Sequence, residues 1–327
     1  MIWTHDQTNN CVMRKYLIVI FFCTLYACAE KFPDGESQYQ DFSPDGIPFT
    51  VSDSAWNVDM LGNHRAIVAV EQSGASNAVR VTLPWRRADL RPETKKIVVV
   101  DVKTGLEIKN VSILDFSSEK GVVAFQPQTV PGTYEVYYLP AKFRKGWDDA
   151  RYGRPWNDYL PPEYATDPDW EKAVKNNSGA IPAAKLTRFE ARSKFDFFTS
   201  MGLIATEKEK QDLKQKNTGD FLLFPEDRAF PIRLTVLPAR WAKKRTSHQF
   251  IGYAAPNEYY TWQTGVWATD KPLKDVRLTF SDFQHSSGYV ISHEDITCFN
   301  TGGTNWDGQP VVFQVEVPLD QVQAMWC

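Results

Sequence analysis

The stretch Ile97-Val-Val-Val-Asp-Val102, followed by the turn Lys103-Thr-Gly105, decides the fold class of this chain. A nearly continuous run of β-branched residues that ends at a glycine turn is typical of a buried strand. A second such run, Thr133-Tyr-Glu-Val-Tyr-Tyr-Leu139, follows the turn signal Pro131-Gly132. Two strands of this kind, each introduced or ended by a turn, favour a sheet in which neighbouring strands are antiparallel.

The residues on both sides of this stretch extend the same pattern. Residues 65–70 and 79–83 alternate apolar and polar side chains, and residues 122–125 form a further short apolar run. Strands at intervals of roughly 8 to 12 residues, separated by Gly/Pro turns, are typical of an antiparallel sandwich. The sequence therefore predicts a mainly β protein whose first β-sandwich spans residues 45–140.

Residues 141–228 are predicted to link this sandwich to the rest of the chain. The part from 141 to 169 has few strand or helix patterns but is rich in aromatic and planar polar side chains. Aromatic faces can stack on the C–H surfaces of sugars while polar side chains take the hydroxyls, and long ordered loops are often functional. Packing of the same aromatics against the sandwich explains the composition more simply. The candidate glycan-binding residues are Trp147, Trp156, Asn157, Asp158, Tyr159 and Trp170.

Two helices are expected in the second half of this linking segment. Leu186, Phe189, Ser193, Phe197 and Met201 recur at helical spacing and would form one docking stripe. Thr206 and Glu209 form a capping box, which predicts a short charged helix ending near residues 217–219.

Strand patterns return in the last hundred residues. They are expected at residues 232–236, 259–268, 276–280, 311–317 and from 322 onwards, with glycines between them. A second antiparallel β-sandwich is therefore predicted for residues 229–327. The final apolar segment, 322–327, reads as a strand after which the domain ends abruptly.

The N-terminal residues 1–29 resemble an export leader. Met13-Arg14-Lys15 precedes an apolar run over 16–27 that is too short to span a bilayer, and residues 1–12 look like an over-called start. Leu25-Tyr-Ala-Cys28 resembles a bacterial lipobox, in which Cys28 would be acylated, whereas Ala27-Cys-Ala29 fits ordinary signal cleavage. We expect an outer-membrane or periplasmic lipoprotein that touches the membrane only through its lipid anchor, or alternatively a secreted protein.

Composition limits the chemistry that this chain can carry. A net charge of −3 argues against a nucleic-acid partner. The sequence contains no phosphate loop, no nucleophile elbow and no histidine or cysteine spacing of a metal site, so neither a cofactor nor a metal is expected. Outside the leader only Cys298 and Cys327 remain, which allow one disulfide at most. A domain of this size does not need one, and Cys298 is expected to be a small buried residue.

Several motifs of this chain are distinctive when taken together. They are Trp85-Arg-Arg-Ala-Asp89, the 97–105 strand and turn, residues 131–140, Trp156-Asn-Asp-Tyr-Leu-Pro-Pro-Glu163, Leu223-Phe-Pro-Glu-Asp-Arg228, and Ile296-Thr-Cys-Phe-Asn-Thr-Gly-Gly303 with Trp306. Together they resemble an exported bacterial family of Bacteroidetes type, the glycoside hydrolase family 123-like proteins, and specifically the N-terminal β region of that family. The resemblance covers roughly residues 45–327.

This resemblance implies a β-sandwich region that precedes a catalytic (β/α)₈ barrel. Enzymes of the family are β-N-acetylgalactosaminidases in which the acetamido group of the substrate is the nucleophile and an adjacent Asp-Glu pair orients it and supplies the acid. This sequence has no Asp-Glu dipeptide; Glu226-Asp227 and Glu294-Asp295 are in reverse order and take no catalytic role. No catalytic residue is therefore expected.

Three functions remain open at the level of the sequence. The first is a non-catalytic N-terminal portion of a family 123-like hydrolase, truncated before the barrel and supporting degradation of glycans that contain N-acetylgalactosamine. The second is a free-standing glycan-binding surface lipoprotein that uses the 143–170 aromatics. The third is a structural module without a ligand.

Overall fold

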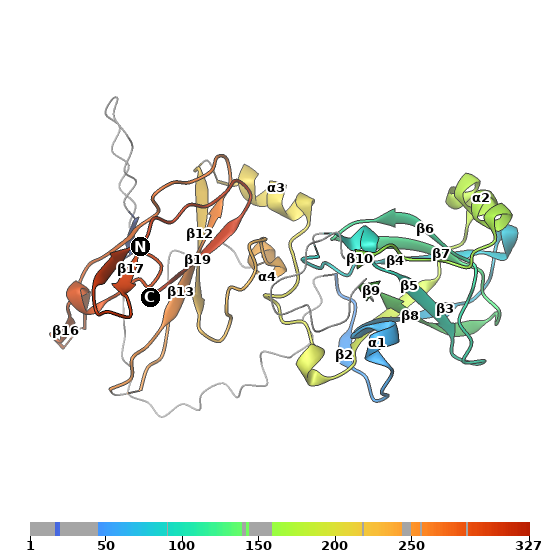
Figure 1. Cartoon of the computed structure of the whole chain (residues 1–327), viewed down its shortest axis with the longest axis horizontal. Coiled ribbons are helices and arrows are strands. Elements are labelled where there is room, and N and C mark those ends of the chain that lie inside the picture. Colours follow the sequence, from blue (N-terminus) through green and yellow to red (C-terminus); the bar gives the residue numbers. More distant parts are fainter. Residues whose placement is uncertain are drawn as a thin grey trace. The chain divides into compact units, whose positions relative to one another are not determined.

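The computed structural model describes residues 17–19, 45–89, 91–138, 142–143, 159–217, 219–243, 250–255, 257–285 and 287–327. The chain divides into two compact units, which we describe separately (Figure 1). The first unit comprises residues 39–199, and the second comprises residues 200–327 together with the N-terminal segment 1–38. Strands outnumber helices in both, so the predicted mainly β class is confirmed.

The first unit contains two sheets that enclose one core. The larger sheet has the order β2 (Phe49–Val51), β11 (Lys185–Ala191), β3 (His64–Val70), β8 (Gly132–Tyr138) and β5 (Ile97–Asp101). The smaller has the order β4 (Val79–Leu83), β7 (Gly121–Phe125) and β6 (Val111–Phe116). All of these pairs are antiparallel except β11 with β2. The predicted first sandwich is therefore present, and it draws one strand from beyond residue 140.

The core between the two sheets follows the alternation read from the sequence. Val79, Val81 and Leu83 of β4 are buried in it, whereas Thr82 between them is exposed. Trp85 closes one end of this core, with its indole nitrogen donating to the Ser117 carbonyl at 2.8 Å. Gly121 is required beneath it, because a Cβ there would lie 2.1 Å from Cη2 of Trp85.

Strand β11 replaces the first of the two predicted helices, so that prediction is wrong. Leu186 and Phe189 do face the core, as the helical spacing suggested. The spacing arises because the register shifts between Leu186 and Arg188: Leu186 pairs with Val68, and Phe189 pairs with Ala66. A β-bulge adds one residue to a strand, so two inward side chains are three positions apart instead of two. Phe197 packs on the same core from the loop after the strand.

Several short elements complete the first unit. Helix α2 (Pro168–Asn176), which the sequence did not predict, starts at Asp167, whose side chain accepts from Asp169 N and Trp170 N, and buries Trp170 and Val174. The other elements of the described residues are helix α1 (Val58–Leu61), the pair β9 (Lys142–Phe143) and β10 (Tyr159–Leu160), and 3₁₀ turns at Ala75–Asn77, Pro92–Thr94, Ser178–Ala180 and Lys194–Asp196.

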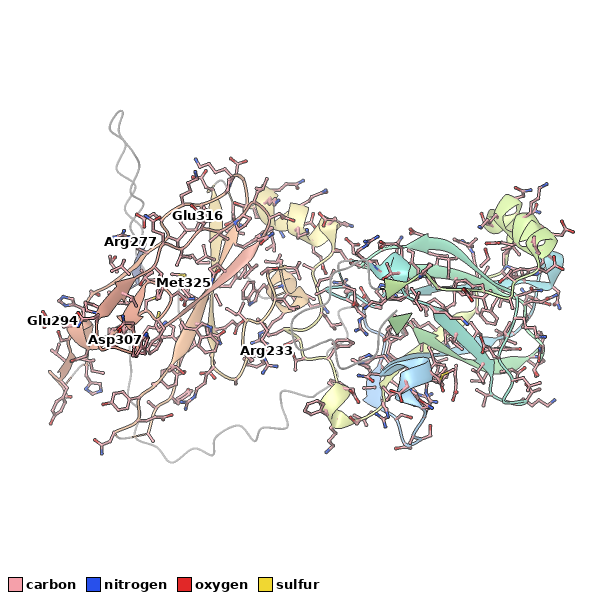
Figure 2. All side chains as sticks on the ribbon, in the orientation of Figure 1. Arg233, Arg277, Glu294, Asp307, Glu316 and Met325 are labelled. Atoms are coloured by element: carbon pink, nitrogen blue, oxygen red, sulfur yellow. The ribbon has the colours of Figure 1, made fainter. Side chains whose placement is uncertain are left out.

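The second unit is built on a three-stranded antiparallel sheet of order β12 (Phe221–Asp227), β13 (Trp262–Ala268) and β19 (Val322–Trp326). Every residue of the central strand β13 is buried, because one core covers each face of the sheet. Trp262, Val266 and Ala268 belong to one core, together with Met325 of β19, which is labelled in Figure 2. Trp267 belongs to the other, with Trp241 of helix α4 (Ala239–Lys243).

The predicted capping box is confirmed in this unit. Thr206 accepts from Glu209 N, and the Glu209 side chain accepts from Thr206 N, at the start of helix α3 (Glu207–Gln215). The strand predicted at 232–236 is wrong: Pro231 and Pro238 flank it, and proline cannot donate to a sheet ladder. β12 was not predicted as a strand.

The layer that covers the first of these cores is mostly irregular. It contains short pairs: β14 (Leu278–Phe280) with β1 (Leu17–Val19), β15 (Phe283–Gln284) with β16 (Val290–Ile291), and β17 (Gly302–Thr304) with β18 (Pro310–Val312), besides a 3₁₀ turn at His293–Asp295. Only the start of the strand predicted at 311–317 is regular. Leu273 and Val317 still bond to each other in both directions, so local pairings join the segments of this layer to one another.

Candidate functional site

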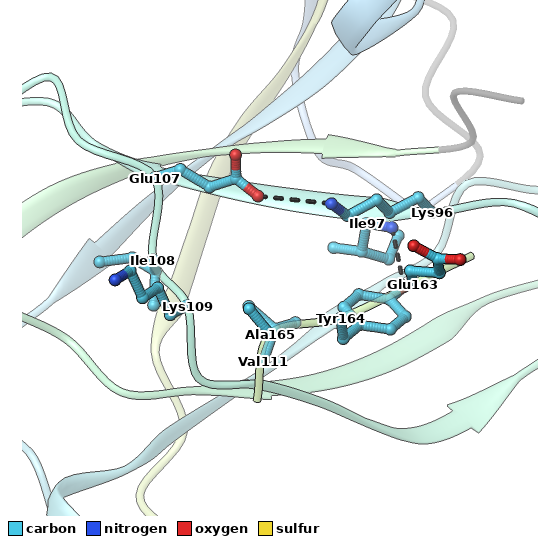
Figure 3. A pocket seen from close by; sticks show the side chains of 9 residues that line it. All are labelled: Lys96, Ile97, Glu107, Ile108, Lys109, Val111, Glu163, Tyr164 and Ala165. Carbon is cyan, nitrogen blue, oxygen red and sulfur yellow. Dashed lines mark hydrogen bonds and ion pairs between the residues drawn. The ribbon is translucent and has the colours of Figure 1, made fainter. Parts of the chain in front are cut away.

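A pocket of about 430 Å³ lies on the first unit beside the edge strand β5 (Figure 3). The turn after β5 forms one wall. Asp101 is buried and its Oδ1 accepts from Lys103 N and Thr104 N, which fixes the turn and returns the chain along the strand. Ile108 N then donates to Val99 O at 2.8 Å. The lining residues are Lys96, Ile97, Glu107, Ile108, Lys109, Val111, Glu163, Tyr164 and Ala165.

Tyr164 forms the opposite wall and binds the strand directly. Its hydroxyl accepts a hydrogen bond from Ile97 N at 3.0 Å (Figure 3). Burial raises the pKa of Tyr164, so the phenol stays protonated. Lys96 Nζ lies 5.8 Å from the centre of the tyrosine ring and 3.5 Å from Glu107 Oε1. The ring is therefore partly covered by a lysine, and the tyrosine holds the edge of the sheet.

The pocket offers polar contacts on an aliphatic floor. Its two lysines, Lys96 and Lys109, supply ammonium donors, and Glu107 and Glu163 supply carboxylate acceptors. Such groups can hydrogen-bond the hydroxyls of a sugar. The lining includes no His, Cys or Ser, so it contains no pairing of a nucleophile with a histidine base.

The structure describes only two of the six predicted glycan-binding residues. Trp147, Trp156, Asn157 and Asp158 lie outside the described residues, as does the predicted acylation site Cys28. Tyr159 pairs with Phe143 through the backbone. Trp170 is buried beside Ala78, Ala124 and Ile181, and its indole nitrogen donates to Ser76 O at 2.9 Å. Trp170 therefore packs in the core and offers no open face for stacking, which corrects its place among the candidates.

Sequence reasoning missed the pocket because its parts are far apart in the chain. Tyr164 lies in the aromatic-rich segment 143–170, while Lys96 and Glu107 border a strand and a turn. A weak signal existed in the alternation of charged and apolar residues over Glu107-Ile-Lys109, which places both charges on one side of an extended segment.

Arg65 is the centre of a buried polar cluster on the outer face of the larger sheet. Its guanidinium donates to Glu190 at 2.7 Å, to Glu135 at 2.7 Å and to the Tyr137 hydroxyl at 3.1 Å. Further donors reach Ser52 and Ser54 at 2.9 and 2.8 Å. Burial alone would raise the pKa of Glu190, but hydrogen bonds from Arg65 and Arg188 lower it below its usual value. Each member has a partner, so this cluster stabilises the sheet.

His64 occupies a second buried cluster, which contains the Trp85–Asp89 motif. Arg87 Nη1 lies 3.0 Å from Nδ1 of His64, and Nε2 of His64 lies 2.6 Å from Asp196 O. A guanidinium can only donate, so Nδ1 accepts and Nε2–H donates to the carbonyl. Arg87 also pairs with Asp89 at 2.8 Å. Burial, followed by the charge of Arg87, lowers the pKa of His64 to about 3, and the imidazole is neutral.

This neutral histidine predicts a loss of stability in mild acid. In the unfolded chain His64 titrates near pH 6.5, so between that pH and about 3 the unfolded state binds more protons. The free energy of unfolding should fall by about 2 kcal/mol from pH 7.5 to 5.0 through this residue alone. Urea unfolding at both pH values should show that His64→Gln removes this part of the difference. A His293→Gln control, at an exposed imidazole beside Asp282, should retain it; an equal loss in both variants would contradict the assignment.

The described residues give no sign of two other kinds of site. Within them, no group of three His, Cys, Asp or Glu side chains is placed to hold a metal ion. Among the helices of the same residues, none has the length and apolar character needed to cross a membrane.

Residues 54–192 match the family model described as "Glycoside hydrolase 123, N-terminal domain". The matched range begins just after β2 and ends just after β11, so it contains most of the sandwich, the pocket and both buried clusters except Ser52 and Asp196. The first unit therefore carries the N-terminal domain of glycoside hydrolase family 123, and the predicted resemblance is confirmed for these residues. The motifs at 223–228 and 296–306 lie outside the match. Comparisons with curated proteins and with solved structures gave no match.

Proposed function

We propose that this chain supplies the non-catalytic β-rich part of a glycan-degrading hydrolase of the family 123 type. The observation that carries this proposal is the match of residues 54–192 to the N-terminal domain of that family. The hydrogen bonds that the buried carboxylates already make support the proposal. Among the described residues the buried carboxylates are Asp101, Glu190 and Glu226. Asp101 fixes a turn, and the two glutamates accept hydrogen bonds from arginines.

The clearest argument against a catalytic role comes from Glu226. It is 2% exposed, and its Oε1 accepts from Trp241 Nε1 at 2.8 Å and from Arg240 Nε at 3.1 Å. A general acid must reach the leaving group at hydrogen-bond distance, which a carboxylate enclosed by its own partners does not. The sequence also lacks the adjacent Asp-Glu pair that the resemblance implies for the catalytic centre.

The purified chain is accordingly expected to show no turnover of an aryl β-N-acetylgalactosaminide. The assay compares release of the aryl alcohol by the native chain with release by the heat-denatured chain, and the two rates should be equal. A native rate in the range of ordinary enzymes, about 1 s⁻¹ or faster, would overturn the proposal. If this activity persisted in both Glu226→Gln and Glu190→Gln, the catalytic acid would be neither of these two glutamates.

A second candidate is a free-standing glycan-binding protein, which the pocket beside β5 favours. Calorimetry with oligosaccharides that contain N-acetylgalactosamine should then give heat that Lys96→Ala and Glu163→Gln abolish. Lys120→Ala, at an exposed ion pair with Asp115, serves as the matched control and should bind normally. Binding that only Trp147→Ala or Trp156→Ala abolishes would assign the glycan to the aromatic segment instead, and absence of binding would remove this candidate.

We also propose that the chain is exported and acylated at Cys28, on the basis of the Leu25–Cys28 lipobox. A radiolabelled fatty acid should be incorporated into the chain in a bacterial host and should be lost in Cys28→Ala. Incorporation that is equal in both would exclude Cys28 as the anchor.

A further inference from the structure

Two cysteines far apart in the sequence lie beside each other in the second unit. Cys298 follows the 3₁₀ turn at His293–Asp295, and Cys327 follows β19. Phe299 N donates to Trp326 O at 2.9 Å, and Trp326 N donates to Asn300 Oδ1 at 2.7 Å. These bonds hold the backbone after Cys298 against the end of β19. Both thiols are buried in the same core, at 6% and 5% exposure.

The surroundings of the two thiols differ. The hydrogen bond from the Cys327 thiol, aided by backbone and hydroxyl donors at Asn300 and Thr301, lowers the pKa of Cys298. The same hydrogen bond and burial raise the pKa of Cys327. The thiolate is the nucleophile of thiol–disulfide exchange, and either cysteine can supply it when β19 is undocked.

From this placement we infer that Cys298 and Cys327 are a disulfide-forming pair that fastens the end of β19 to the turn at residues 298–301. The side chains of a disulfide must start from neighbouring backbone positions, and the bonds around Phe299 and Trp326 meet that condition. The position of Cys327 is fixed by β13, because Cys327 N donates to Trp262 O at 3.0 Å and Trp262 N donates to Cys327 O at 2.9 Å.

The oxidation needs an oxidant of the disulfide class. The Cys298 thiolate attacks one sulfur of that disulfide, whose S–S bond breaks and releases one thiolate. The Cys327 thiolate, formed by loss of its proton, then attacks the Cys298 sulfur of the mixed disulfide and releases the second thiolate. Two protein thiols have lost two protons and two electrons, and the oxidant has become two thiols. Because both sulfurs are buried in the folded unit, the oxidant reaches them while β19 is undocked.

Refolding of the full chain in a glutathione redox buffer tests the pair. After refolding, free thiols are blocked with N-ethylmaleimide and the chain is digested. No Lys or Arg follows Arg277, so one tryptic peptide, 278–327, carries both cysteines and should lose two hydrogen atoms without gaining the label. Cleavage after Glu294 and Glu316 should separate the two cysteines, and the two fragments should remain joined until a reductant is added.

The control variant is Cys298→Ser, in which Cys327 should carry either the label or one glutathione and never an internal disulfide with residue 298. The oxidised wild type should also unfold several degrees higher than the reduced wild type, with no such shift in Cys298→Ser. Labelling of both Cys298 and Cys327 after refolding in every glutathione mixture would overturn the inference. So would pairing of either one with Cys11, Cys23 or Cys28. Neither result bears on the glycan assays, so this inference can fail independently of the proposed function.

Discussion

Replacing Arg65 by methionine is expected to lower the free energy of unfolding of the first unit by about 3–5 kcal/mol. The substitution keeps an extended apolar side chain but removes five donors, and it leaves Glu190 buried with Arg188 as its remaining ionic partner. The serine hydroxyls of Ser52 and Ser54 lose their shared partner as well. Denaturant unfolding of the full chain, with hydrogen exchange used to follow β3, β8 and β11, would measure the loss.

Arg91→Met is the matched control for this substitution. Arg91 forms an ion pair with Glu93 at 3.0 Å, but the two side chains are 49% and 58% exposed. Exposed pairs contribute about 0–1 kcal/mol because water screens the charges and two long side chains must be ordered. Comparable losses at Arg65 and Arg91 would show that the buried cluster is not what stabilises the outer face of the sheet.

Gly265→Ala is expected to destabilise the second unit by about 3 kcal/mol, since inserting a methyl group into a close-packed core forces the surrounding groups to shift. A Cβ at position 265 of β13 would lie 2.2 Å from Cη2 of Trp241. That indole cannot yield easily: it is fully buried, stacks on Phe224 at 4.4 Å and donates to Glu226. Thermal unfolding followed by tryptophan fluorescence should report both the lost stability and a changed environment of Trp241.

Gly303→Ala provides the comparison. Gly303 also lies in a strand, β17, but nothing stands within 4 Å of the position that its Cβ would take. Its substitution should change the free energy of unfolding by no more than about 0.5 kcal/mol. Equal effects at the two glycines would mean that the contact with Trp241 does not determine the cost, since the reduced freedom of the unfolded chain favours alanine at both positions.

The sequence predicted those elements whose signal is local. Strands β3, β4, β5 and β8 follow from alternation or β-branched runs bounded by turns, and α3 follows from its capping box. The same reasoning was wrong for β11, because its β-bulge places the core-facing side chains three positions apart, as in a helix. β12 was missed since its Pro225 interrupts the pattern, although the residue still pairs with Thr264.

The candidate site depended on contacts that no local pattern encodes. Tyr164 was counted with the linking aromatics, yet its hydroxyl meets the amide of Ile97, 67 positions away. Trp170 was counted as a stacking surface, yet an unpredicted helix turns it into the core. Composition therefore indicated where aromatic residues are concentrated, and only the tertiary arrangement distinguishes an aromatic that packs from one that can bind.

The position of β11 has a consequence for how the first unit forms. This strand comes last in the unit's sequence, but it lies between β2 and β3 in the sheet. During synthesis the pairing edge of β3 stays vacant until residues 185–191 have left the ribosome, and β2 has no partner before then. Closing so long a loop costs chain entropy before any contact repays it. The rate of folding should therefore be set by the arrival of this distant segment, and a chain cut before residue 185 would retain an open edge available to other chains.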